Sequence, residues 1–168
     1  MSSDRAGLGL VHAAVRLIVG LLFVGHGLRK LRPVLGGPGL DGAEAQMEGL
    51  GLRPARANAA AAATTQLVGG GMLAAGLLTP VASTAIAANM IVAMRTAQAG
   101  KGPWAIDGGW EYPLVLTAAA LALAEHGPGP LSLDRLLGTE RTGTVTGLAS
   151  LGAALAGSEA VLAAARNG

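Results

Sequence analysis

The chain has 168 residues, enough for one domain, of which 51% are hydrophobic and only 13% are charged, and its mean hydropathy is +0.51. This apolar weight comes with 27 glycines, which closely packed membrane helices use to bring their backbones together, so we expect an integral membrane protein. The net charge of +2, without basic residues clustered beside aromatics, excludes nucleic acid as a partner, and the lack of cysteine excludes thiol chemistry and Cys-ligated metals.

The first apolar run, residues 8–28, is long enough to cross the hydrocarbon core as a helix. A signal peptide would have a shorter run and a small-residue cleavage site, whereas HGLRKLRP follows here, so we expect this helix to be retained. At about 100° per residue, one arc of roughly 80° holds His12, Arg16, Phe23, His26 and Lys30. Gly20 and Gly27 lie beside this arc, which predicts a polar, closely packed face.

The following segments are predicted from their turn and capping signals. Residues 32–58 form a polar loop, in which Asp41, Glu44 and Glu48 have the spacing of a short amphipathic helical turn. One helix covers residues 57–78, and Pro80 begins the next, which runs to about residue 99. A fourth helix starts near residue 111 and ends at HGPGP, and LSLDRLL predicts a short interfacial helix capped by Ser132.

Residues 144–165 are apolar, and their leucines at positions 148, 151, 155 and 162 share one helical face. Ala/Gly-rich segments insert weakly and Glu159 is costly near lipid, so we expect an amphipathic helix on the surface or against the bundle. The predicted fold is all-α: a four-helix transmembrane bundle over residues 1–138, with an extra C-terminal amphipathic or weakly membrane-inserted helix in residues 139–168.

Three of the four aromatic residues, Trp104, Trp110 and Tyr112, stand just before the fourth helix. Rings at this place are typical of anchors at the membrane interface. Glu111 has two interpretations: a carboxylate in the first helical turn that interacts with the helix dipole, or a member of a polar site.

Because successive helices alternate in direction, several polar residues are expected to meet in a cleft that opens on one side of the membrane. The candidates are Arg16, His26, Lys30, Gln66, Asn89, Arg95, Glu111 and Tyr112. Arg16 lies inside the first span, where a charge costs at least about 2.5 kcal/mol, and Glu125 is its expected ion-pair partner. The alternative is that each of the two side chains extends to the nearer headgroups. The three histidines lack an acidic cluster, so no metal or haem site is expected.

Five segments in register resemble the DoxX family of small four-helix membrane proteins over about residues 10–135. They are RLIVGLLFVGHGLRKL, LVGGGMLAAGLLTPVAS, NMIVAM, GGWEYPLVLTAAALAL and GPGPLSLD. The resemblance implies membership of oxidoreductase complexes in the cell membrane, such as thiosulfate:quinone oxidoreductase and assemblies that link thiol homeostasis to detoxification of oxygen species. The chain departs from the family pattern at Gln66, where the family commonly has a Glu. An amide at this position cannot take part in proton transfer as a carboxylate can.

The expected function is that of a non-catalytic membrane subunit or anchor of such a complex, linked to quinone or to thiol and oxidative stress. Its expected partners are membrane lipids and soluble or membrane oxidoreductases, and its candidate cofactor is quinone. The alternative is a transmembrane bundle that handles a small molecule or a lipid. No nucleophile and base pair, cofactor fingerprint or metal-ligand spacing predicts catalysis by this chain alone. Membrane orientation and oligomeric state stay open.

Overall fold

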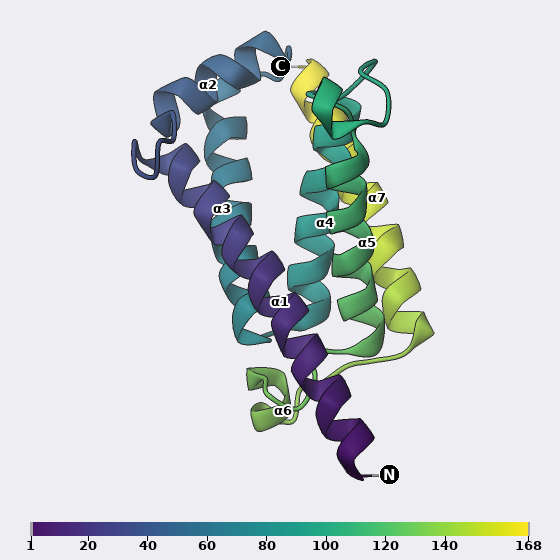
Figure 1. The fold of residues 1–168 in the computed structure, drawn as a ribbon. Coiled ribbons are helices and arrows are strands. Elements are labelled where there is room, and N and C mark those ends of the chain that lie inside the picture. The colour runs from purple at the N-terminus through teal and green to yellow at the C-terminus, as the bar shows by residue number, and fades with distance from the viewer. Residues whose placement is uncertain (1, 168) are drawn as a thin grey trace.

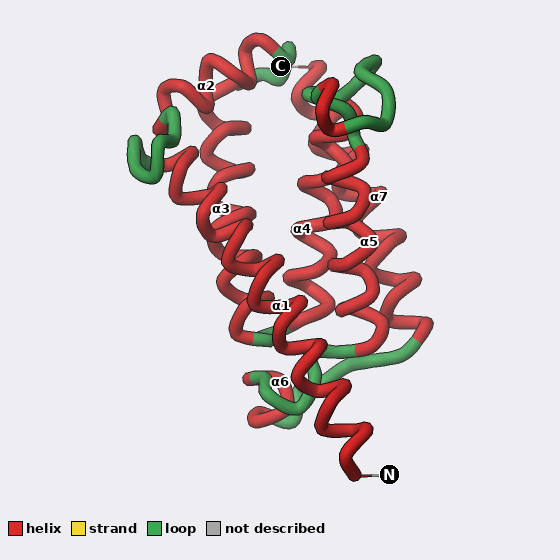
Figure 2. The backbone as a smooth tube through the Cα atoms, viewed as in Figure 1, coloured by secondary structure: helices red, strands yellow, loops and turns green. Residues whose placement is uncertain are grey.

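The computed structural model describes the chain from residue 2 to residue 167, and its side chains from residue 9 to residue 165. The secondary structure of this part of the chain consists of helices joined by loops, with no strand (Figure 2). In chain order, the elements are α1 (Ser2–Leu31), α2 (Gly39–Gly49), α3 (Ala55–Ala75), α4 (Thr79–Arg95), the 3-10 turn η1 (Ala105–Asp107), α5 (Glu111–His126), α6 (Leu133–Leu137) and α7 (Thr144–Asn167).

Five long helices, α1, α3, α4, α5 and α7, form the bundle (Figure 1). Helix α1 packs along α3, α4 packs against α3 and α5, and α7 packs along α4 and α5. Helix α2 lies across one end of the bundle, next to the C-terminal end of α7, and α6 lies at the other end (Figure 1). The start of α1 and the end of α7 lie at opposite ends of the bundle (Figure 1).

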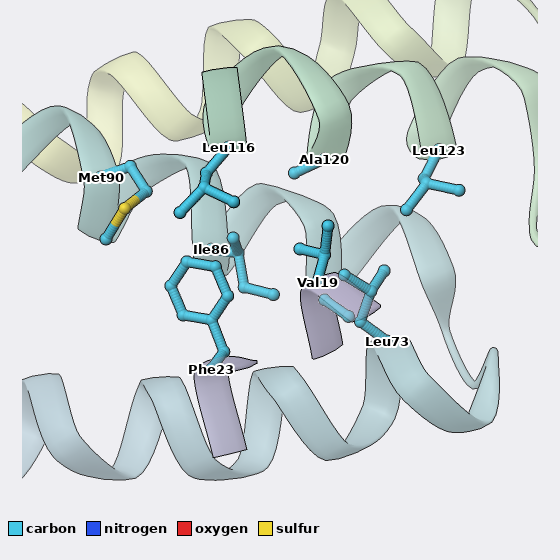
Figure 3. Close-up of a cluster of buried hydrophobic side chains, with 9 residues drawn as sticks. Val19, Phe23, Leu73, Ile86, Met90, Leu116, Ala120 and Leu123 are labelled. Carbon is cyan, nitrogen blue, oxygen red and sulfur yellow. The ribbon is translucent and has the colours of Figure 1, made fainter. Parts of the chain in front are cut away.

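The centre of the bundle is closed by a cluster of buried side chains from four helices (Figure 3). Phe23 of α1 points toward Ile86 and Met90 of α4, with Leu116 of α5 beside them (Figure 3). Phe23 is the only phenylalanine of the chain, and it is fully buried here. Most of the core is otherwise built from aliphatic and small side chains, as the composition predicts.

The expected close packing of the first helix is confirmed where α1 meets α3. A Cβ atom at Gly20 would lie 2.6 Å from the nitrogen of Ala74 and 2.6 Å from the carbonyl oxygen of Gly70. A Cβ atom at Gly27 would lie 2.6 Å from the nitrogen of Leu67. Only glycine leaves room for this approach, so the two helix backbones touch.

The outer surface of the bundle is apolar, whereas its interior holds polar groups. Large apolar side chains that face outward include Leu10, Ile18 and Leu21 of α1, Val115 of α5 and Leu148 of α7. Such a broad apolar exterior is typical of a surface that meets lipid rather than water. The distribution agrees with an integral membrane protein.

Two helices among the described residues are long and apolar enough to cross a membrane. They contain the stretches Gly9–Leu31 in α1, with a mean hydropathy of 1.7, and Thr144–Ala165 in α7, with a mean hydropathy of 1.5. Helix α5, with 16 residues, is about 24 Å long, shorter than a hydrocarbon core of about 30 Å. Of the four membrane spans expected from the sequence, length and hydropathy support the one in α1. The same criteria add α7 as a second candidate span.

The C-terminal helix differs from expectation in the face that it buries. Leu148 and Leu155 are 63% and 47% exposed, whereas Ser150, Ala154 and Ser158 are buried against the bundle. The leucines that share one helical face are thus only partly buried. The face that α7 packs against α4 instead carries small residues at four-residue spacing, which let the two helices approach closely. Among the alternatives, α7 is packed on the bundle rather than lying apart from it (Figure 1).

Candidate functional site

A cavity of about 560 Å³ lies in the half of the bundle that α2 covers. Residues from α1, α3, α4, α5 and α7 form its wall, and residues of α2 and the following turn also line it. The helices that carry these residues can be followed in Figure 1, where α1 and α3 lie on one side, α4 and α5 on the other, and α2 across the top.

The inner end of the cavity is apolar. Phe23, Met90 and Leu116 line it, and the same three side chains belong to the central buried cluster (Figure 3). Beyond them, Leu73 and Ile86 are fully buried. The cavity therefore ends in the middle of the bundle.

The other end of the cavity is covered by α2, which the sequence predicted only as a short amphipathic turn. Met47 of α2 is buried together with Leu52, Ala59 of α3 and Leu162 of α7. The backbone nitrogen of Arg53 donates a hydrogen bond to the carbonyl oxygen of Ala165 at 3.1 Å. These contacts tie the segment after α2 to the end of α7, so the two elements close over the cavity together.

Two amides meet at the cavity wall. Gln66 of α3 donates from Nε2 to Oδ1 of Asn89 on α4 at 3.0 Å, and both residues line the cavity. Gln66 is only 5% exposed, and its Oε1 has no hydrogen-bond partner among the described residues. Gln98, in the turn after α4, also lines the cavity with a buried Oε1 that has no partner in this part of the chain. The wall thus presents buried acceptors that are unused.

Two basic side chains of α1 reach the same cavity. His26 and Lys30 line it from the last two turns of the helix, and Tyr112 lines it from the start of α5. No aspartate or glutamate is among the lining residues, and within residues 9–165 no carboxylate forms an ion pair with Lys30. The cavity is therefore mostly apolar, with hydrogen-bond donors on one helix and acceptors on others.

The remaining expected members of the cleft lie elsewhere. Arg95, in the last turn of α4, forms an ion pair with Glu159 of α7 outside the cavity. Glu111 accepts a hydrogen bond at Oε1 from the backbone nitrogen of Ala105 at 2.9 Å, so it orders the loop that precedes α5. This contact is local: Glu111 is not among the residues that line the cavity and forms no ion pair within residues 9–165.

The aromatic residues before α5 are exposed. Trp104 and Trp110 do not line the cavity, and both present ring surface to the outside, as does half of Tyr112. Ile106, between them, is also exposed. This arrangement suits rings at a membrane interface, which stays a prediction.

Arg16 is buried at the opposite end of the bundle from the cavity, and its expected ion pair with Glu125 is absent. Its guanidinium donates to three backbone carbonyl oxygens, those of Ala74 at 3.1 Å, Pro128 at 2.6 Å and Leu131. Glu125 instead accepts from the hydroxyl of Thr144 at 3.0 Å. A planar guanidinium fork can donate to several carbonyls at once. The carboxylate of Asp134, rather than that of Glu125, lies close enough for its charge to act on Arg16.

Sequence reasoning missed the role of Asp134, although it predicted α6 and its cap. The hydroxyl of Ser132 accepts from the nitrogen of Arg135, as expected of a capping serine. The carboxylate of Asp134 is buried and accepts from the nitrogens of Leu78 and Thr79 at the start of α4. One feature of the sequence could have indicated this role. Leu78, the residue before α4, has no side chain that can cap the helix, so the first N–H groups of α4 need acceptors from another part of the chain.

No group of three or more His, Asp or Glu residues within the described ranges is placed to hold a metal ion. The rings of His12 and His126 lie 6.3 Å apart at the end opposite the cavity, without an acidic cluster beside them. The cavity is thus the feature of this bundle best shaped to hold a small molecule.

The chain was compared with known families, curated proteins and solved structures. The model of the DoxX family matches residues 11–99, more than half of the chain, from α1 to the turn after α4. This range includes His26, Lys30, Gln66 and Asn89, whereas α5, α6 and α7 lie outside it. Neither the curated proteins nor the solved structures contain a match to the chain.

Proposed function

The chain belongs to the DoxX family, and from that premise we propose that it is a non-catalytic subunit of an oxidoreductase complex in the cell membrane, which binds a quinone-like molecule in its cavity. In this role the chain holds and orients a lipophilic electron carrier while partner proteins carry out the electron transfer. The cavity is the observation that supports this proposal, because a subunit that only anchored a complex would need no cavity of ligand size.

The chemistry of the cavity suits a lipophile with a small polar head. Its volume of about 560 Å³ lies within the range of small-molecule sites, which are mostly apolar with a few placed polar groups. His26 and Lys30 supply N–H groups that can donate to the oxygen atoms of a quinone head, and the amides of Gln66 and Asn89 lie at the wall of the same cavity. Aliphatic surface around Phe23 and Met90 suits an apolar ring or tail.

The division of labour with partner proteins follows from the side chains that the sequence contains. The chain has no cysteine, so it brings no thiol redox couple of its own. Electrons would therefore be carried by the bound molecule and exchanged with a soluble or membrane-bound oxidoreductase. The apolar outer faces of α1 and α7 support placement in a membrane, and we propose that this is the cell membrane.

The alternative, passage of a solute through the bundle, is less well supported. Toward the middle of the bundle the cavity ends at Phe23, Met90 and Leu116, which belong to the central buried cluster. A carrier that only holds its ligand needs one opening, whereas a channel needs two.

The proposal is tested by identifying the molecules that remain bound to the purified protein. Full-length protein isolated in mild detergent is extracted with organic solvent, and its lipophiles and co-purifying proteins are identified by mass spectrometry. Ala62→Phe, at the cavity wall, is expected to lose bound quinone because the ring fills the space. Ala57→Phe, on the exposed side of the same helix, is the control and is expected to retain it.

Two results would contradict the proposal. Equal quinone content in Ala62→Phe and Ala57→Phe, at matched folded yield, would place the quinone outside the cavity. Absence of any oxidoreductase among the co-purifying proteins of the wild type would remove the assembly from the proposal.

A further inference from the structure

Resting on the proposed ligand cavity, we infer that its ligand carries a hydroxyl group, which donates a hydrogen bond to Oε1 of Gln66. This deepens the proposed function, because it names the chemical group that the cavity recognises. Alcohols, phenols and quinols belong to this class, whereas ethers and fully oxidised quinones have no hydroxyl hydrogen to donate.

The first step of the argument is the unused acceptor. Gln66 is 95% buried, lines the cavity, and has its Nε2 committed to Asn89 at 3.0 Å. Its Oε1 has no hydrogen-bond partner among the described residues. A buried carbonyl oxygen without a partner is costly, and native proteins almost always supply one. Since Gln66 is one of the residues that line the cavity, we infer that a ligand bound there supplies the missing donor.

The second step is the geometry of an amide pair. When one amide donates to another, one oxygen of the pair stays without a partner, and three N–H groups stay free, one on the donating amide and two on the accepting amide. Exchange of oxygen and nitrogen in both Gln66 and Asn89 reverses the bond between them but still leaves one oxygen without a partner, then on Asn89. A hydroxyl group can donate to this oxygen and accept from a free N–H group, whereas a carbonyl or ether oxygen can only accept.

The third step concerns the rest of the wall. Gln98 also presents a buried Oε1 without a partner in the described chain, so unused acceptors occur at two places of one cavity. A ligand with acceptors alone would leave these oxygens unsatisfied. The N–H groups of His26 and Lys30 can donate to a carbonyl or an ether oxygen of a ligand, but neither forms a hydrogen bond with Oε1 of Gln66. Within a quinone couple, the reduced form therefore fits the amide pair and the oxidised form does not.

The experiment compares two probes, one with a hydroxyl hydrogen and one with a methyl group in its place. Full-length protein in detergent is titrated with a para-alkylphenol and with the methyl ether of the same alkylphenol. Affinity is taken from the rise in unfolding temperature across each titration, which follows mass action. The wild type is expected to bind the phenol about tenfold more tightly than the ether, since loss of one hydrogen bond to a buried acceptor is of this order.

Variants assign the preference to Gln66. Gln66→Leu removes the acceptor at similar volume and is expected to bind both probes equally. Because this change leaves Asn89 without its amide partner, the double variant Gln66→Leu with Asn89→Leu replaces the whole pair by apolar groups and keeps the test valid if the single variant folds poorly. Val68→Leu, on the outward face two residues further along α3, is the matched control and is expected to keep the tenfold preference.

The possible outcomes separate this inference from the function on which it rests. Equal affinity of the wild type for phenol and ether overturns the hydroxyl inference while the ligand cavity stands. A preference for the phenol that persists in both Gln66 variants also overturns it, since another group then recognises the hydroxyl. Failure of the wild type to bind either probe, or any quinone, overturns the proposed ligand cavity itself.

Discussion

The carboxylate of Asp134 on α6 accepts hydrogen bonds from both the backbone nitrogen and the hydroxyl of Thr79 on α4, at 2.9 and 2.8 Å. It also accepts from the nitrogen of Leu78 at 2.8 Å and from the hydroxyl of Thr139 at 3.0 Å. A side chain more than fifty residues away thus caps the start of α4, near the backbone carbonyls that bind Arg16. The end of the bundle opposite the cavity is held by this polar cluster.

Asp134→Asn is expected to lower the free energy of unfolding by roughly 1–3 kcal/mol, because an amide oxygen cannot replace two carboxylate oxygens that accept four hydrogen bonds. Thermal unfolding in detergent measures the loss. Asp107→Asn, in the exposed turn η1, is the control and is expected to change the unfolding temperature little.

The same carboxylate predicts a dependence of stability on pH. Burial of Asp134 by itself would raise the pKa of its carboxyl, but the hydrogen bonds from Thr79, Leu78 and Thr139 outweigh burial, and the pKa lies below its ordinary value. A lowered pKa in the folded state gives stability that is complete above the ordinary pKa of about 3.9 and is lost as the pH falls below it. The unfolding temperature of the wild type should therefore fall on acidification below about pH 4, and the fall should be smaller in Asp134→Asn. An identical pH profile for both proteins would contradict this assignment.

Arg16 is expected to tolerate no replacement that lacks its guanidinium fork. Arg16→Lys should lower the unfolding temperature because an ammonium cannot reach the carbonyls of Ala74, Pro128 and Leu131 together. Arg16→Glu should be worse than Arg16→Leu, because it buries a second carboxylate near Asp134. Exchange of charges in the double variant Arg16→Glu with Glu125→Arg should give no rescue, since the two side chains are not paired. Recovery of stability in that double variant would restore the ion pair expected from the sequence.

Gly20→Ala is expected to destabilise the bundle by about 1–3 kcal/mol, because the added methyl group lies 2.6 Å from backbone atoms of α3 that cannot move aside without separating the helices. Gly25→Ala, on the same helix, is the matched control: nothing lies within 4 Å of its Cβ position. The control should be neutral or slightly stabilising, as alanine favours the helix over glycine. The two variants are compared by thermal unfolding in the same detergent, and equal behaviour would show that α1 and α3 are not in backbone contact.

Glu111→Gln is expected to leave the ligand of the cavity in place. The side chain accepts from the nitrogen of Ala105 and does not line the cavity, and a neutral amide can keep that bond at a loss of at most roughly 1 kcal/mol of dipole interaction. The measurement is the amount of bound lipophile in the variant and in the wild type at matched folded yield. If Glu111→Gln lost the lipophile while the wild type kept it, Glu111 would be part of the ligand site after all.

Ala154→Leu tests whether α7 is part of the bundle. Ala154 is fully buried where α7 meets α4, beside Ala87 and Ile91, so a leucine would overpack the contact and cost roughly 1–3 kcal/mol. Ala153→Leu, at an exposed position next to it, should have little effect. Similar unfolding temperatures for the two variants would mean that α7 is detached.

The sequence by itself determined where most helices form, because their signals are local. Apolar runs, the proline at position 80 and the capping serine at position 132 predicted α1, α3, α4, α5 and α6 close to their observed bounds. Family membership was also readable, since it depends on motifs in order along the chain. Of the residues expected in the cleft, His26, Lys30, Gln66, Asn89 and Tyr112 do line one cavity, because their depth along each helix follows from counting residues.

Only the tertiary structure decided which polar groups meet. Partners across helices depend on the rotation of each helix about its axis and on the course of the loops, and a single sequence specifies neither. Arg16 was expected to pair with Glu125, yet its guanidinium donates to the carbonyl of Ala74 in the last turn of α3 and to two carbonyls of the loop after α5, while Asp134 caps α4. In the same way, α7 buries its small residues rather than most of its leucines, because close backbone approach to α4 needs small side chains and lipid accepts the large ones.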